Sequence, residues 1–353
     1  MAAKHISNKK QDIVFLNIVF CLIVIFIHIS SEIVLKMDRG HTLYWTVYTL
    51  SRLSSFVVQG FIMLSGAKLF LKVGNLRYGK FYLSRLTSIV LPYVVWVVIY
   101  YLYFCSRNYF VFSWNELLRF ILVGDLAAHF YFIVILVQFY LLMPVWVLLF
   151  KKANPCVALV VTLMISIISN TCLGDIIQLA FPSADISYIN VFFSKYLFYW
   201  TAGCMIGLHY QEFQNYLKKH WITITLFYVV CAVLNSWLSI VMIDNKVYWL
   251  ELIHMLYIIS ALLFFYMLAQ MFIAGDAVLL KPIGWLNSIT FDIYLIHCLV
   301  IFITEEFLDI FGIYSYSARF GWKALAAYVG SVVLCMLWKI TRNTLARLIR
   351  DKD

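Results

Sequence analysis

The sequence predicts an all-α, polytopic membrane protein of about ten transmembrane helices, with both termini in the cytoplasm. Composition is the first observation: 64% of the 353 residues are hydrophobic, only 12% are charged, and the mean hydropathy is +0.90. A soluble domain carries about 25% charged residues, so most of this surface must face something other than water. The second observation is a series of long apolar runs, and the third is an uneven distribution of basic residues between the segments that join them.

The apolar runs define the expected helices. A helix needs about 20 apolar residues to cross a bilayer, and only the fifth run is short. A further stretch, 114–124, is too short to span and is expected to lie at the interface or to re-enter the membrane. The ten expected spans cover residues 13–35, 43–67, 82–104, 129–150, 156–173, 190–208, 221–243, 249–272, 288–308 and 321–341.

Loop charges give the orientation. With the N-terminus inside, the cytoplasmic segments hold 18 of the 27 Lys and Arg residues. The outer segments hold seven, with Arg319 and Lys323 among them, while Arg52 and Lys195 fall inside spans. This bias is the one that cytoplasmic loops show, and an even number of spans returns the C-terminus to the same side. The bias also explains the net charge of +10. No basic run interleaved with aromatic residues occurs outside the apolar spans, so nucleic acid is not expected as a partner.

The chain reads as one domain over residues 1–353. It contains no Pro/Gly/Ser linker, no low-complexity tract and no obvious repeat. Residues 338–353 form a basic, amphipathic segment that is expected to lie on the anionic inner leaflet; binding to a partner is the alternative. The eight cysteines are spread singly and form no CxxC pair, so neither a metal site nor a required disulfide is expected.

Polar residues at membrane depth are costly and therefore mark candidate sites. The alternative for each histidine is a neutral ring that is bonded to a neighbouring helix or that simply lies at the interface. Asp125, four residues before His129, could orient that ring if the local chain is helical. The candidates in the predicted spans are His28, Arg52, His129, Gln138, His254 and His297.

A basic loop stands out on the predicted inner side. Positive-inside bias alone could place it there, and a phosphate-binding site is the alternative, with Arg85 as its best candidate. Outer-half histidines above an inner basic loop suit a reaction that uses an anionic cytoplasmic donor, although a proton-coupled transporter could use the same residues. The loop contains Lys68, Lys72, Arg77, Lys80 and Arg85 within 18 residues.

At these residues the chain resembles the acyltransferase family 3 membrane proteins, which include O-acetyltransferases of bacterial cell-surface polysaccharides. Family members begin with an Asp-x-Leu-Arg-like stretch and a His eleven residues past the Arg. This chain has Asp12, Leu16 and His28 in place, with Asn17 where Arg is usual. Four further motifs follow in the family's order: SR…FIMLSGAKLF, FYLSRLTSIVLPYVVW, HFYFIVILVQFYLLMPV and NSITFDIYLIHCLV.

The resemblance implies an enzyme of the bacterial cytoplasmic membrane that takes an acetyl or similar acyl group from acyl-CoA, without a metal. The acceptor would be a hydroxyl of a saccharide or glycolipid, and polysaccharide synthesis or export machinery would be a partner beside the bilayer. His28 is the residue carried over as catalytic. Arg52, Arg85, His129 and His297 match motif positions, and Asn17 puts donor binding at its own position in doubt.

A direct-transfer mechanism follows as a hypothesis. His28 would accept the hydroxyl proton, Arg52 or Gln138 would stabilise the oxyanion, and Arg85 with Lys80 and Arg77 would hold the cofactor phosphates. Sixteen residues separate Asp12 from His28, roughly 24 Å of helix. The pantetheine arm therefore reaches through a channel or the acyl group is relayed, and the sequence leaves both open. A transporter or export component for a polysaccharide, or a structural subunit, remains the alternative function.

Overall fold

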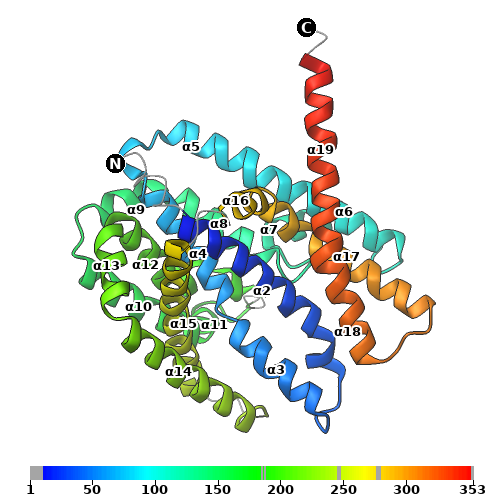
Figure 1. The fold of residues 1–353 in the computed structure, drawn as a ribbon, viewed down its shortest axis with the longest axis horizontal. Helices are drawn as coiled ribbons and strands as arrows, with labels where there is room; N and C mark the ends of the chain where they lie inside the picture. Colours follow the sequence, from blue (N-terminus) through cyan, green and yellow to red (C-terminus); the bar gives the residue numbers. More distant parts are fainter. Residues whose placement is uncertain (1–10, 184–185, 187, 245–247, 276–279, 351–353) are drawn as a thin grey trace. The chain divides into compact units, whose positions relative to one another are not determined.

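The computed structural model describes residues 11–183, 186, 188–244, 248–275 and 280–350, and these contain helices and turns but no strand (Figure 1). The chain groups into two compact units. The first holds Met1–Val57, Ser236–Val241 and Leu268–Asp353, and the second holds Val58–Asn235 and Met242–Met267. Because α14 and α15 contribute to both, neither unit is one continuous segment, and the single domain stays a prediction.

The first unit is built on the N-terminal helix α2 (Gln11–Lys36). Helices α3, α16, α17 and α18 all contact α2, which makes it the central element of this unit. The chain then continues through a π-helical turn into the C-terminal helix, shown in orange and red in Figure 1. The elements are α3 (Thr42–Ser54), α16 (Leu280–Asn287), α17 (Thr290–Ile310), α18 (Tyr316–Leu325), η5 (Ala326–Gly330) and α19 (Ser331–Arg350).

The second unit contains shorter and more strongly bent helices. Its elements are α4 (Val57–Phe70), η1 (Val73–Asn75), α5 (Tyr78–Arg85), the π-helical turn η2 (Leu86–Val90), α6 (Leu91–Ser106), α7 (Trp114–Val123), α8 (Tyr131–Leu141), α9 (Met143–Phe150), α10 (Pro155–Thr171), α11 (Leu173–Ala180), η3 (Ile189–Val191), η4 (Phe193–Tyr196), α12 (Leu197–Leu208), α13 (Tyr210–Lys219), and most of α14 (Trp221–Val241) and α15 (Tyr248–Gly275).

The all-α membrane fold is confirmed, whereas the count of ten spans is not. Among the described residues six helical segments are long and apolar enough to cross a membrane, and two bent pairs raise the number to eight if each pair is one span. One pair, α8 with α9, bends by 60°, and the other, α10 with α11, bends by 65°. Pro144 stands at the start of α9, where its missing N–H and fixed φ favour a break.

Two expected spans account for the difference. Residues 190–208 form two 3₁₀ turns and then α12, whose 12 residues rise only about 18 Å, less than the roughly 30 Å of a bilayer core. The expected span 288–308 is the helix α17, but α17 carries four acidic residues and does not pass the composition test for a span. Helix length therefore removes the first of these from the count, and acidic residues remove the second.

Small residues let α4 and α12 approach closely within the second unit. A Cβ added to Gly203 would lie 2.0 Å from the Met63 carbonyl oxygen, and one added to Gly207 would lie 2.7 Å from that of Ala67. On the facing helix, a Cβ at Gly66 would meet the Trp200 carbonyl at 2.8 Å. Gly203 and Gly207 are four apart, the spacing at which small residues bring membrane helices together.

Candidate functional site

Two histidines of the first unit face each other from different helices. His28 lies on α2 and His297 on α17, and their ring centroids are 5.1 Å apart with the planes tilted by 52°. The His297 ring is fully buried, whereas His28 keeps part of its surface exposed. Of the two residues, His28 is therefore the less buried one.

Hydrogen bonds define the tautomer of His297. Its Nδ1 lies 3.1 Å from the Ile293 carbonyl oxygen, which can only accept, so Nδ1 carries the proton. Nε2 then has a lone pair and lies 3.3 Å from Sγ of Cys298. The ligand atoms of His28, His297 and Cys298 lie within 4.8 Å of one another, so these three side chains could hold a metal ion. The expected lack of a metal stays a prediction.

Two other predicted residues belong to the same unit. Asn17 donates from Nδ2 to Oδ1 of Asn287 at 2.9 Å, which ties α2 to α16 in place of the cation that the family usually has there. Arg52, on α3, donates from Nε to the hydroxyl of Ser239 at 3.2 Å. Asn17 is therefore held by a neutral amide partner, Asn287. Arg52 is a cation of the same unit, and its helix α3 contacts α2.

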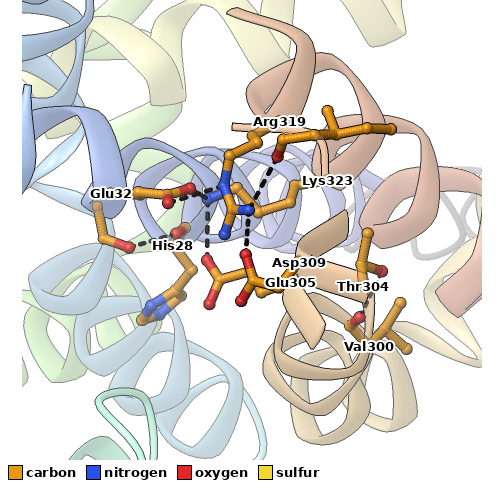
Figure 2. A network of polar contacts seen from close by, with 10 residues as sticks. His28, Glu32, Val300, Thr304, Glu305, Asp309, Arg319 and Lys323 are labelled. Carbon is orange, nitrogen blue, oxygen red and sulfur yellow. Dashed lines mark hydrogen bonds and ion pairs between the residues drawn. The ribbon is translucent and has the colours of Figure 1, made fainter. Parts of the chain in front are cut away.

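An ion cluster with three buried members, Glu32, Arg319 and Lys323, was absent from the sequence-based candidates and lies one turn beyond His28. It consists of Glu32 on α2, Glu305 and Asp309 on α17, and Arg319 and Lys323 on α18, and Figure 2 shows the two cations reaching toward all three carboxylates. The N–O distances are 2.5–2.9 Å, and Lys323 is only 1% exposed. Arg319 and Lys323 were expected to be outer-loop charges. Both are buried because α18 packs against α2 and α17.

The remaining six predicted residues belong to the second unit. His129 does not open a helix as expected: it lies in a turn before α8, is 2% exposed, and packs on Tyr100 and Phe130. The helix that would let Asp125 orient His129 does not form: the chain between them is not helical, and Asp125 pairs with Arg119 at 2.5 Å. The hydrogen-bonded carboxylate of Glu116 beside Arg119 raises the pKa of that guanidinium above its ordinary value.

Gln138 and His254 have structural partners. The Gln138 amide donates to the Val191 carbonyl at 2.7 Å and accepts from the Phe193 N–H at 3.2 Å, so it holds the turns η3 and η4. The amide nitrogen also donates to the Val134 carbonyl at 3.4 Å, so both of its N–H groups are used and this arrangement does not offer Gln138 as an oxyanion donor. His254 bonds through Nδ1 to Oδ1 of Asn235 at 2.9 Å, which links α15 to α14.

The three predicted phosphate ligands share helix α5 or its N-terminal cap. Arg77 and Lys80 are exposed, and Arg85 is half-buried with its guanidinium carbon 5.3 Å from the Phe81 ring and 5.4 Å from the Tyr140 ring. Its Nε makes no hydrogen bond within the described part of the chain. The sequence has no acidic residue between Asp38 and Glu116, so these cations have no acidic neighbour along the chain.

Comparison with known proteins decides the family. A family described as an acyltransferase domain matches residues 13–340, which covers nearly the whole chain and both histidines of the pair. The chain belongs to acyltransferase family 3. The expected resemblance is thereby confirmed.

Curated relatives of this acyltransferase-family chain carry a different kind of name. A probable poly-β-1,6-N-acetyl-D-glucosamine export protein of Staphylococcus epidermidis is 21% identical over 315 residues, which cover 86% of this chain and 85% of that protein. A protein of the same description from Staphylococcus aureus strain MRSA252 is 22% identical over 316 residues, with the same coverage. No solved structure matches the chain.

Proposed function

We propose that this protein moves an acetyl or similar small acyl group from acyl-CoA to a hydroxyl of a cell-surface or lipid-linked saccharide, in a bacterial cytoplasmic membrane. The observation that carries the proposal is the pairing of a partly exposed His28 with a buried, tautomer-fixed His297 in a chain of an acyltransferase family. A neutral imidazole is suited to accept a proton near neutral pH.

Transfer of the acyl group from the thioester to the hydroxyl needs a single base, His28. The saccharide hydroxyl gives its proton to His28 as its oxygen attacks the thioester carbon, and a tetrahedral oxyanion forms. The oxyanion collapses, the C–S bond breaks, and the imidazolium returns the proton to the coenzyme A thiolate. Arg52 is the cation that we assign to the oxyanion, since a preorganised donor in a low-dielectric site stabilises the developing charge.

The donor phosphates require cations that lack counterions. Within the described part of the chain no carboxylate pairs with Arg77, Lys80 or Arg85. Arg85 also presents a planar fork that matches a phosphate. Their assignment to coenzyme A rests on this chemistry and on the family.

The test uses the purified protein in lipid nanodiscs with radiolabelled acetyl-CoA and a β-1,6-linked N-acetylglucosamine oligomer as acceptor. His28→Ala should lower the transfer rate by about 10²–10⁴-fold, the usual contribution of a general base. His209→Ala, at an exposed position after α12, is the control and should keep the rate. A wild-type rate in His28→Ala would remove His28 as the base.

An export function is the second candidate, because the curated relatives are named as export proteins of a glucosamine polymer. The two functions differ in the need for a donor. An acyltransferase must bind acetyl-CoA, whereas an exporter must move the polymer without it. If the purified protein fails to bind acetyl-CoA while cells that lack it retain polymer inside, the export function is correct and the proposed transfer is not.

A further inference from the structure

In the ion cluster, two cations of α18 each bond one carboxylate of α2 and one of α17. Each cation with its two carboxylates is called a rung. Lys323 bonds Oε2 of Glu32 on α2 and Oε1 of Glu305 on α17. One turn earlier on α18, Arg319 bonds Oε1 of the same Glu32 and Oδ1 of Asp309, one turn later on α17. Each cation of α18 therefore joins α2 to α17, and Glu32 is common to both rungs (Figure 2).

A second set of contacts shows that α2 and α17 run parallel in a defined register. The thiol of Cys21 lies 3.6 Å from the Thr290 carbonyl oxygen, and the His28 ring faces the His297 ring. Seven residues separate the two contacts on each helix, which is about two turns, so both contacts use the same face of each helix. The histidine pair therefore lies between the Cys21 contact on one side and the ion cluster on the other.

We propose that Glu32, Arg319 and Lys323 are positioning residues that fix the register of α2 against α17 and thereby hold His28 against His297. The inference rests on the proposed function, in which that pair carries the proton transfer. Glu32 follows His28 by one turn on α2, so a shift of the helix that breaks the rungs moves the imidazole by a similar distance.

Burial argues that the cluster provides specificity rather than stability alone. Lys323 is 1% exposed, Glu32 is 9% exposed and Arg319 is 8% exposed, so their charges have lost most of their contact with solvent. Apolar residues of similar volume often replace a buried ion pair without loss of stability, whereas charges accept only a narrow range of geometries. Misplacement of a reacting group by about 1 Å can lower a rate by about 10²-fold, so such a geometric constraint has a use here.

The test removes one rung without leaving an unpaired charge. The double variant Lys323→Met/Glu305→Gln keeps the rung of Arg319 with Glu32 and Asp309. We expect it to fold in nanodiscs with a 10- to 100-fold lower kcat and a KM for acetyl-CoA within about twofold of wild type. Lys323→Arg keeps the charge and should retain most of the wild-type kcat. This variant is the one to measure if the double variant does not fold. Glu116→Gln, in an exposed ion pair of the second unit, is the control and should change neither constant.

Register is measured separately from activity. Thr290→Cys introduces a thiol at the residue whose carbonyl the Cys21 thiol contacts. Mass spectrometry of peptides after mild oxidation then quantifies the disulfide between positions 21 and 290. The yield should fall several-fold when Lys323→Met/Glu305→Gln is added. Unchanged cross-linking, with or without a change in kcat, would overturn the inference. A lower yield in a protein that transfers no acyl group would support the register-fixing role and overturn the proposed function instead.

Discussion

Arg319 and Arg85 are both arginines on membrane-associated helices, and their surroundings differ in one respect. Arg319 is paired with two carboxylates, Glu32 and Asp309. Arg85 rests on the Phe81 and Tyr140 rings, and among the described residues no carboxylate pairs with it. A π-helical turn begins right after Arg85, and another begins three residues after Lys323, so local backbone geometry does not distinguish the regions.

The difference separates two uses of charge in a bilayer. A cation with carboxylate partners in the protein is neutralised in the folded state, and its ion pairs join the helices that carry them. A cation without them keeps a field that only a ligand or headgroup can neutralise. The comparison therefore predicts that the ion cluster governs stability and register, whereas Arg85 governs affinity for an anion.

The largest effect is expected at the paired arginine. Arg319→Met breaks the buried pair with Glu32, which then keeps Lys323 alone, and removal of one partner of a buried pair costs about 3–5 kcal/mol. Asp309 is 59% exposed, so water can solvate it after Arg319 is lost. The free energy of unfolding, measured by denaturant titration in mixed micelles, should fall by about this amount. Arg319→Lys retains a charge and is the control. Unchanged stability in Arg319→Met would show that the cluster does not join these helices.

The second unit should depend on close packing more than on ion pairs. Gly203→Ala places a methyl group 2.0 Å from the Met63 carbonyl, so α12 and α4 must separate, at a cost of about 1–3 kcal/mol. The same denaturant titration measures the loss. Gly79→Ala on α5, where a Cβ would meet nothing within 4 Å, is the matched control and should not destabilise the protein. Equal stabilities in both variants would contradict the packing of α4 on α12.

Arg85 should show the opposite behaviour to Arg319. Arg85→Met loses two ring contacts worth about 0.5–1 kcal/mol each, and stability should change little. Loss of a charged hydrogen bond to a phosphate costs about 1.5 kcal/mol, so the Kd for acetyl-CoA should rise about tenfold by calorimetry. Arg85→Lys keeps the charge without the planar fork and should bind with intermediate affinity. An unchanged Kd would move the phosphate site away from Arg85.

The smallest effect is expected at an exposed ion pair. Arg119 and Glu116 are 33% and 48% exposed, and such pairs contribute about 0–1 kcal/mol. Glu116→Gln should lower the free energy of unfolding by less than 1 kcal/mol, and the loss should disappear at about 1 M salt, where the Debye length is about 3 Å. A loss as large as that of Arg319→Met would mean that burial does not separate the two ion pairs.

The sequence allowed accurate placement of most helices, because apolar runs must be helical to satisfy their backbone in lipid. It failed at residues 190–208, where a run that is apolar enough for a span forms 3₁₀ turns and a short helix held by Gln138. The partner of Gln138 is the backbone of that run, and no residue pattern identifies such a contact in advance.

The candidate site was predicted in part. The identity of His28 and His297 was available from polar residues within apolar runs, but their separation of 269 positions hides their contact. The ion cluster was missed because Arg319 and Lys323 were counted as outer-loop charges. A signal existed, since Glu32 falls inside the first expected span and an intramembrane carboxylate needs a partner.

The sequence by itself determined that this is a membrane protein, that it is helical, and to which family it belongs. Hydropathy, charge bias and ordered motifs are properties of the chain alone. Only the tertiary structure decided which charges are neutralised and which histidines meet. Those outcomes depend on helix register, and residues such as Glu32 and Lys323, 291 positions apart, acquire a common register only when α2, α17 and α18 pack together.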